Sequence, residues 1–363
     1  MTDDRIAPRP EVWATPPEQH GALDYAELER AGLGPEQVLD FSVNSNPYGP
    51  SPLVRQALAW TPLDRYPDRE ALALRRALSA QQGVALDHIL VGNGTAELIW
   101  LLAMAFVRPG DRALVVGPTF GEYARAVTLM GGCVARWTAR PEQDFAVETT
   151  ALRRMGQRTG PRIVFLCNPN NPTGVVVPSS QIHEWAAAQP RTLFVIDEAY
   201  YQFVPGFRTA ADSRRSNLVV LRSMTKDYAL AGLRLGYALG TRAVIRALAR
   251  VRPPWSVNAL AQAAGVVALG DREHLQDSMR KLRRDRETLR AGLVALGLHP
   301  APSVTHYFLL PVGNGLVFRR ALMNKGILVR DCASFGLPGH VRIATRTPEE
   351  NARLLEGVRE AGK

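Results

Sequence analysis

The stretch NLVVLRSMTKDYALAGLRLGYALG (217–240) decides the fold, because it places one lysine between two short apolar runs. Only four of the chain's 44 Lys and Arg residues are Lys, and the other three lie in charged, helix-end or terminal contexts. Arginine stays protonated, whereas a partly desolvated lysine amine can lose its proton and form a Schiff base. The stretch therefore indicates a chemical role for Lys226.

Strand-like apolar runs alternate with helix-like segments on both sides of this lysine. Continuous apolar strands between helices predict a mostly parallel sheet that helices cover on both faces, which is an α/β fold. Binding sites in such sheets form where loops leave the strand ends. The runs expected to form strands are HILVG (88–92), RALVVG (112–117), RIVFLC (162–167), TLFVID (192–197), NLVVLR (217–222) and RLGYALG (234–240).

The length of 363 residues exceeds the size at which one core stops growing, so two domains are expected. The first twenty residues are Pro-rich and suggest a mobile arm. Beyond about residue 245, a long helix over 257–296 with a break near Gly270 precedes short strands and helices, which predicts a smaller α+β domain. The expected division is 1–48 for the arm and part of the small domain, 49–248 for the large domain and 249–363 for the small domain.

Composition excludes several classes of protein. The longest apolar run, LIWLLAMAFV (98–107), is too short to span a bilayer, and no secretory leader is recognised. Three widely spaced cysteines argue against a disulfide framework or a zinc site, so we expect a cytoplasmic protein without a metal. The net charge of +10 comes from arginines spread along the chain, with no nucleic-acid module, so neither nucleic acid nor membrane is an expected partner.

Two motifs follow predicted strands. NPNNPTG (168–174) combines two Pro and one Gly in a rigid loop whose Asn side chains offer amide donors to a ligand. VIDEAY (195–200) ends a strand on Asp197, and a buried carboxylate needs a cationic partner such as a protonated heterocyclic nitrogen. A metal site or a salt bridge is the alternative for Asp197, although no GxxxxGK[ST] phosphate loop accompanies it.

Two further motifs suggest an anion site. GNGTAE (92–97) would open a helix with the free N–H groups of Gly94 and Thr95, although Thr95 as a plain N-cap explains it equally well. The hydroxyls of Ser223 and Thr225, with the guanidinium of Arg234, could bind a phosphate near the Lys226 amine.

These four motifs, in this order, resemble the pyridoxal-phosphate enzymes of the aspartate-aminotransferase fold, also called fold type I. The resemblance covers nearly the whole chain. It implies a mostly parallel seven-stranded sheet in the large domain, pyridoxal 5'-phosphate as the cofactor, and a homodimer in which Tyr66 reaches the partner's cofactor. It implies Lys226, Asp197 and Tyr200 as catalytic residues. The implied cofactor contacts are Gly94, Thr95, Phe120, Asn171, Asp197, Tyr200, Ser223, Thr225, Lys226, Arg234 and Tyr66.

Within that fold the chain resembles the histidinol-phosphate aminotransferase branch, and inside it most closely the threonine-phosphate decarboxylases. The segments that carry this likeness are His20–Gly21 before LDFSVNSNPYGP, PPWSVNALA (253–261), LRSMTK (221–226), ILVRDCASF (327–335) and VRIATRTPEEN (341–351), with Arg346 where the aminotransferases usually have Gly. The implied substrate is a small phosphorylated amino acid. Its implied contacts are His20, Gly21, Asn44, Asn171, Arg330 and Arg342.

Two forked guanidiniums suit a substrate that carries a carboxylate and a phosphate, so Arg330 and Arg342 agree with this implication on physical grounds. The expected reaction is decarboxylation of threonine phosphate to aminopropanol phosphate for cobalamin synthesis. The alternative is a histidinol-phosphate aminotransferase, because one cofactor frame supports both reactions. A third alternative is a binding protein that keeps the fold and attaches no cofactor to Lys226.

Overall fold

The computed structural model describes residues 6–212 and 215–361, and its centre is a seven-stranded sheet of order β2-β8-β7-β6-β5-β3-β4. Only β8 runs antiparallel to its neighbours, so the sheet is mostly parallel, as predicted. The strands are β2 (Ile89–Gly92), β3 (Arg112–Gly117), β4 (Cys133–Thr138), β5 (Ile163–Cys167), β6 (Leu193–Asp197), β7 (Leu218–Ser223) and β8 (Gly236–Leu239).

Burial explains why these runs form strands. Every residue of β5, β6 and β7 is buried, as expected for central parallel strands covered on both faces. The six predicted runs all contain strands. Strand β4 is partly exposed along its length and lies at the sheet edge, and its residues form no continuous apolar run.

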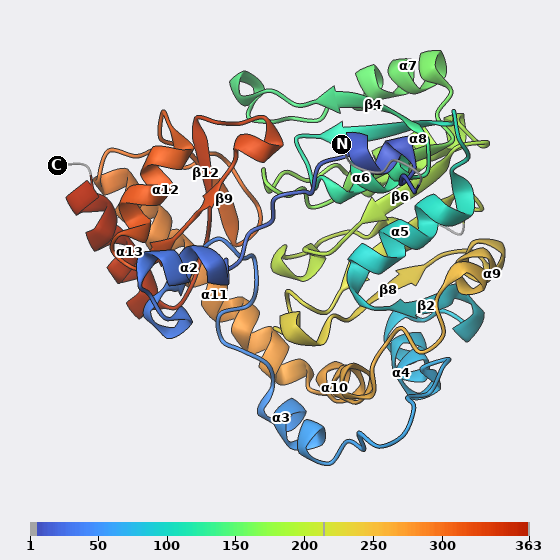
Figure 1. The fold of residues 1–363 in the computed structure, drawn as a ribbon, viewed down its shortest axis with the longest axis horizontal. Coiled ribbons are helices and arrows are strands. Elements are labelled where there is room, and N and C mark those ends of the chain that lie inside the picture. The colour runs from blue at the N-terminus through green and yellow to red at the C-terminus, as the bar shows by residue number, and fades with distance from the viewer. Residues whose placement is uncertain (1–5, 213–214, 362–363) are drawn as a thin grey trace.

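Helices pack around this sheet (Figure 1). Helix α5 is apolar on nearly all sides and is accordingly buried against β7, β8 and α6. The helices around the large sheet are α3 (Pro52–Ala59), α4 (Leu72–Gln82), α5 (Gly94–Phe106), α6 (Glu122–Leu129), α7 (Thr149–Thr159), α8 (Ser179–Ala188), α9 (Arg242–Val251) and α10 (Ala259–Gly270).

A smaller sheet lies to the left in Figure 1 with its own apolar core, and it matches the predicted α+β part. Its antiparallel strands are β11 (Arg330–Asp331), β12 (His340–Ala344) and β9 (Tyr307–Pro311), beside the parallel pair β1 (Leu39–Asp40) and β10 (Ile327–Leu328). The surrounding helices are α2 (Tyr25–Ala31), α11 (Arg272–Ala295), α12 (Gly315–Met323) and α13 (Pro348–Ala361).

The run ILVRD forms two short strands, because Val329 separates a segment paired with β1 from one paired with β12. Helix α12 ends at Met323, three residues before Gly326. The break near Gly270 is confirmed, since α10 ends there and Asp271 caps α11 by accepting a hydrogen bond from the His274 amide at 3.2 Å.

The boundary at residue 249 stays a prediction, and the packing of α10 suggests a different one. This helix packs on α3 and α4 and shares the apolar core of the large sheet. Gly265 allows the close approach, because a Cβ there would lie 2.7 Å from a methyl carbon of Leu235 and 2.9 Å from one of Leu74. We therefore propose that α10 belongs with the large sheet.

The N-terminal arm crosses from the small sheet to the large one (dark blue in Figure 1). Its helix α1 (Pro10–Ala14) contacts α6, and the Arg9 guanidinium donates to the Leu129 carbonyl oxygen at 3.0 Å. Whether the arm is mobile stays a prediction. No helix within the described ranges is long and apolar enough to cross a membrane.

Candidate active site

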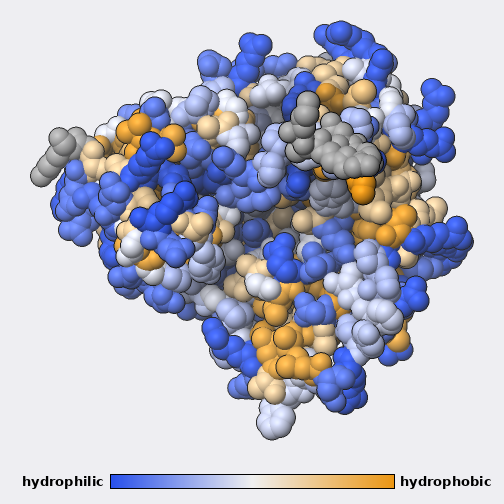
Figure 2. Space-filling view, viewed as in Figure 1, coloured by the Kyte–Doolittle hydropathy of each residue, from blue (hydrophilic) through white to orange (hydrophobic). Residues whose placement is uncertain are grey.

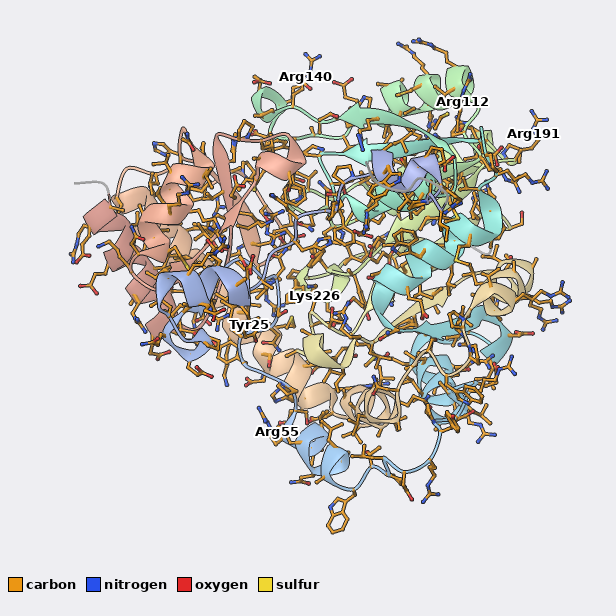
Figure 3. All side chains as sticks on the ribbon, in the orientation of Figure 1. Tyr25, Arg55, Arg112, Arg140, Arg191 and Lys226 are labelled. Atoms are coloured by element: carbon orange, nitrogen blue, oxygen red, sulfur yellow. The ribbon has the colours of Figure 1, made fainter. Side chains whose placement is uncertain are left out.

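A cavity of about 470 Å³ lies at the carboxyl ends of β5, β6 and β7, and residues from both sheets and from the arm line it. Figure 3 shows Lys226 near the centre of the molecule. The predicted site residues on the cavity wall are His20, Gly21, Asn44, Thr95, Phe120, Asn171, Asp197, Tyr200, Ser223, Thr225, Lys226, Arg234, Arg330 and Arg342. The fold thus gathers nearly all of the predicted residues at one place.

Lys226 lies three residues beyond the end of β7 and is partly accessible from the cavity. Burial in protein, together with the positive charges of Arg342 and Arg234, lowers the pKa of its amine from 10.5 to about 8. A sizeable fraction of the amine is therefore unprotonated near neutral pH, which a lysine needs in order to attack an aldehyde.

Asp197 ends β6 and is buried at the floor of the same cavity. Its Oδ2 accepts a hydrogen bond from the Tyr123 hydroxyl at 2.7 Å, and its Oδ1 accepts one from the Ala199 amide at 3.1 Å. Burial raises the pKa of the carboxyl from 3.8 to about 6, against the effect of these two donors. A carboxylate that is ionised at neutral pH and poorly solvated favours a cationic ring nitrogen as its partner.

The anion site forms where α5 begins beside β7 and β8. Gly94 has φ +77°, and a Cβ on it would lie 3.1 Å from an Arg234 nitrogen. The hydroxyls of Ser223 and Thr225 are 2.7 Å apart. Gly94 itself is not on the cavity wall, but Thr95 and Arg234 are. Free helix N–H groups, two hydroxyls and a guanidinium together fit a phosphate.

The plain N-cap alternative for Thr95 is wrong. Helix α5 already begins at Gly94, so Asn93 occupies the N-cap position and Thr95 lies inside the first turn. The Glu97 carboxylate accepts a hydrogen bond from the Asn93 amide at 2.7 Å, which satisfies a donor next to the helix start. The amide of Thr95 stays near the cavity, since Thr95 itself lines it.

Two guanidiniums from the small sheet enter the cavity. Arg342 is buried and donates to the Asn171 side-chain oxygen and to the Ser42 carbonyl oxygen. Arg330 donates to the Gln19 carbonyl oxygen and to the Ser334 hydroxyl, both at 2.7 Å. These cations lie in adjacent strands of one sheet, as the register pairs Arg330 with Arg342.

The arm closes one side of this region. A Cβ on Gly21 would lie 2.4 Å from the Ser42 carbonyl oxygen and 3.4 Å from an Arg342 nitrogen, so only glycine fits there. His20 lies 3.4 Å from the Glu122 carboxylate, and its ring is 5.4 Å from that of Phe120. His20 thus lines the cavity while its side chain stays 49% exposed.

Asn44 and Tyr200 complete the polar wall. Both amide atoms of Asn44 are buried without a well-formed hydrogen bond. The Asn44 side chain nevertheless lies close enough to the Tyr200 hydroxyl to act on its pKa in the lowering direction. Burial raises the pKa of the Tyr200 hydroxyl above its ordinary value, so this group is a neutral donor at neutral pH. Unused buried polar atoms that face a cavity are an indication that a ligand completes them.

Tyr66, like Gly94, is a predicted site residue that does not line the cavity. Its side chain is 77% exposed and stacks on Trp255 with ring centroids 4.6 Å apart. Its implied contact with the cofactor of a partner subunit remains a prediction.

Tyr123, Glu122 and Ser334 line the cavity although no sequence pattern above singles them out. Tyr123 bonds Asp197, Glu122 contacts His20, and Ser334 bonds Arg330. Glu122 also accepts a hydrogen bond from the indole of Trp100 at 3.1 Å. The sequence indicates these three residues only through their closeness in the chain to Phe120 or Arg330.

Within the described part of the chain, no group of three or more His, Cys, Asp or Glu side chains could hold a metal ion.

Comparison with known proteins identifies the class. The profile of the family described as aminotransferase class I and II matches residues 36–358, and the chain belongs to this family. Membership confirms the predicted cofactor, pyridoxal 5'-phosphate, and makes the chain a pyridoxal-phosphate-dependent enzyme of this class.

Similar proteins within the family include aminotransferases and a decarboxylase. The chain is 38% identical over 341 residues to the histidinol-phosphate aminotransferase of Symbiobacterium thermophilum, covering 91% of this chain and 92% of that protein. The structure of the histidinol-phosphate aminotransferase from Sinorhizobium meliloti, in complex with pyridoxal-5'-phosphate, matches with a TM-score of 0.87 over 98% and 97% of the two chains, at 24% identity, which confirms the predicted fold. L-threonine-O-3-phosphate decarboxylase from Porphyromonas gingivalis matches with a TM-score of 0.77 over 88% and 98%, at 29% identity.

The lowered pKa of Lys226 gives a testable prediction. In the cofactor-free protein, acetylation of Lys226 by acetic anhydride should rise with pH through a midpoint near 8 and level off about one pH unit higher, because only the neutral amine reacts. Mass spectrometry of the peptides measures this, with the exposed Lys281 in the same sample as the internal reference. Labelling of Lys226 that still rises steeply beyond pH 9.5, about where an ordinary lysine begins to titrate, would contradict the prediction.

Proposed function

We propose that this enzyme acts on a small phosphorylated amino compound and transfers its amino group, with histidinol phosphate as the amino donor and 2-oxoglutarate as the acceptor. The observation that carries the proposal is the placement of Arg330 and Arg342 in one cavity with Lys226. Guanidiniums bind carboxylates and phosphates through paired donors, and both substrates of this reaction are anions.

Named relatives support transamination ahead of decarboxylation, which reverses the order expected from the sequence motifs. The relatives that are 35% and 38% identical over more than 90% of the chain are named histidinol-phosphate aminotransferases. Both reactions use the same cofactor contacts, so those contacts do not separate them.

In this proposal the residues around Lys226 hold the cofactor. Asp197 keeps the ring nitrogen protonated, and Phe120 stacks on the ring. The bound cofactor supplies an electron sink for a bond at the substrate's Cα. The remaining proposed contacts are Asn171 and Tyr200 at the ring oxygen and Gly94, Thr95, Ser223, Thr225 and Arg234 at the phosphate.

Lys226 would also move the proton in this reaction. An amine whose pKa lies near 8 can accept a proton from Cα and return it within one catalytic cycle, because neither form is strongly favoured near neutral pH. The Cα bond that breaks would be the one held perpendicular to the cofactor ring. Arg330 and Arg342 set this pose through the substrate's anionic groups, with His20, Gly21 and Asn44 as the other proposed contacts.

Decarboxylation of threonine phosphate is the second candidate. The likeness at 29% identity to a structure titled as that decarboxylase favours it. Arg346, which stands where aminotransferases usually have Gly, donates to the Asp40 carbonyl oxygen at 3.0 Å and to Glu350 at 2.8 Å. It thereby ties the segment after β12 to the strand before Asn44, close to the proposed substrate contacts.

A direct comparison of the two reactions tests the proposal. The purified protein with pyridoxal 5'-phosphate is given histidinol phosphate plus 2-oxoglutarate in one assay and threonine phosphate in the other. Glutamate formation in the first and no CO₂ from the second is the expected result. Release of CO₂ with formation of aminopropanol phosphate, and no glutamate, would replace the proposal with the second candidate.

The role of Arg330 can be tested separately. Arg330→Met should raise KM for the phosphorylated substrate about 30-fold or more and change kcat less, because a buried charge partner is lost from the bound state. Arg320→Met serves as the matched control, since Arg320 is exposed on α12. Equal KM values for the two variants would remove Arg330 from the substrate site.

We also propose that the enzyme is a cytoplasmic homodimer. Exposed apolar side chains gather around α3 and the segment after it, with Trp60 87%, Leu63 78% and Tyr66 77% exposed. Figure 2 shows hydrophobic surface at this end of the molecule. Large exposed apolar side chains that lie close together favour a protein interface. A dimer by light scattering that Trp60→Glu converts to monomer supports the proposal, and a monomeric parent protein contradicts it.

A further inference from the structure

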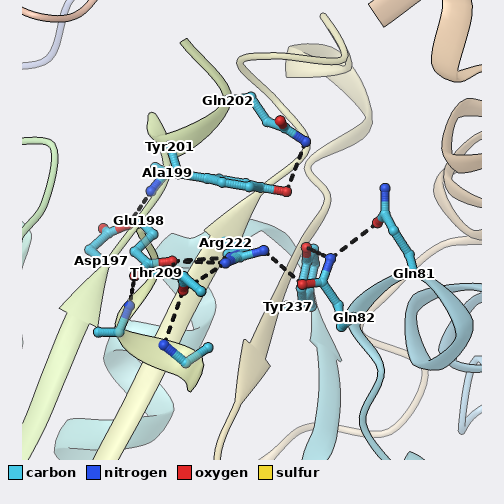
Figure 4. Close-up of polar contacts among 12 residues, drawn as sticks. Gln81, Gln82, Asp197, Glu198, Ala199, Tyr201, Gln202, Thr209, Arg222 and Tyr237 are labelled. Atoms are coloured by element: carbon cyan, nitrogen blue, oxygen red, sulfur yellow. Dashed lines mark hydrogen bonds and ion pairs between the residues drawn. The ribbon is translucent and has the colours of Figure 1, made fainter. Parts of the chain in front are cut away.

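A buried ion pair lies directly behind the cofactor cavity. Arg222 Nη2 and Glu198 Oε2 are 3.0 Å apart, with side chains 4% and 0% exposed. The Nε atom of Arg222 also donates to the same oxygen at 3.2 Å. Figure 4 shows the pair and its polar contacts. Neither residue lines the cavity.

The position of this pair in the chain connects it to the site. Glu198 follows Asp197 at the end of β6, and Arg222 precedes Ser223 at the end of β7. The two strands are adjacent and parallel, and the Glu198 amide donates to the Leu221 carbonyl oxygen at 2.8 Å. Successive side chains of a strand point to opposite faces. The ion pair therefore joins the strands on one face while Asp197 and Ser223 reach the cavity on the other.

Further contacts hold the pair in one geometry. Thr209 donates to Glu198 at 2.7 Å and accepts from Arg222 at 2.8 Å. Gln82 of α4 accepts from Arg222 at 2.7 Å, and the Tyr201 ring lies 3.9 Å from the guanidinium carbon. A buried ion pair is a poor source of stability unless such contacts satisfy it, but its removal on one side is strongly destabilising. Specific geometry is thus the better reason for its presence.

We propose that Arg222 and Glu198 are positioning residues that fix the ends of β6 and β7 relative to each other, and so set the separation of Asp197 from Ser223, Thr225 and Lys226. This inference rests on the proposed cofactor contacts of those four residues. A cofactor whose ring nitrogen and phosphate are held from different strands binds tightly only if the strand ends keep a fixed spacing.

The charges of the ion pair also act on the pKa of Asp197. The negative charge of Glu198 raises the pKa of Asp197, in addition to the larger effect of burial. Arg222 offsets that charge in the intact protein. Burial raises the pKa of Glu198, and the Arg222 guanidinium opposes this effect. Removing the guanidinium therefore favours a protonated Glu198 and changes the charge beside Asp197.

The test measures cofactor binding rather than turnover. Arg222→Met should weaken the affinity of the cofactor-free protein for pyridoxal 5'-phosphate about tenfold or more, a loss of at least about 1.4 kcal/mol. It should also shift the pH midpoint of the bound cofactor's absorbance change. Arg222→Lys keeps the charge but not the forked donors, so it should restore only part of the affinity. Arg319→Met is the matched control, because it breaks an ion pair with Glu27 in the small-sheet region.

Each result of these measurements leads to a different conclusion. If Arg222→Met remains folded by circular dichroism, its affinity stays within about twofold of the parent and its pH midpoint stays within about 0.3 units, the positioning role is refuted. An equal loss in Arg319→Met also refutes it, because the effect is then general destabilisation. If Arg222→Met does not fold, Gln82→Met removes one contact of Arg222 from α4 and should weaken binding about threefold, and unchanged binding refutes the role. A parent protein that binds no cofactor refutes the proposed function instead.

Discussion

The partial desolvation of Lys226 beside two guanidiniums is the constraint on which the rest of the site depends. Without it the amine would stay protonated near neutral pH and could not react with an aldehyde. The same cavity holds a buried carboxylate, Asp197, whose pKa is raised. Both groups are therefore poorly compensated in the protein alone, and a ligand that brings a cationic ring nitrogen and anionic groups would complete the charge balance.

A parallel sheet makes this arrangement possible, because the carboxyl ends of its central strands meet at one edge. Loops from β5, β6 and β7 bring amide, carboxylate and amine groups together there, while β11 and β12 supply guanidiniums from the opposite side. The arm adds the third wall, with the Gln19 carbonyl oxygen already bonded to Arg330. An anionic substrate that binds Arg330 must compete with, or rearrange, this contact.

Much of this site could be predicted from the sequence because its residues lie in short local motifs at strand ends. The buried strands follow from continuous apolar runs; Asp197 ends one of these strands and Lys226 lies three residues beyond another. Other parts depend on tertiary packing that no local pattern reports. Tyr123 bonds Asp197 across 74 residues, and the strand β4 has only a partly buried pattern. The choice between transamination and decarboxylation rests on substrate pose, which neither motif nor fold encodes alone.

Reduction of the enzyme–cofactor complex with borohydride, followed by peptide mass spectrometry, tests the central claim most directly. The chain has only four lysines, so the attachment site can be assigned without ambiguity. The expected result is one reduced pyridoxyl group per chain on Lys226, and none on a Lys226→Ala variant under the same conditions. Attachment mainly to Lys281 or Lys325, or no attachment with the protein folded, would contradict the account.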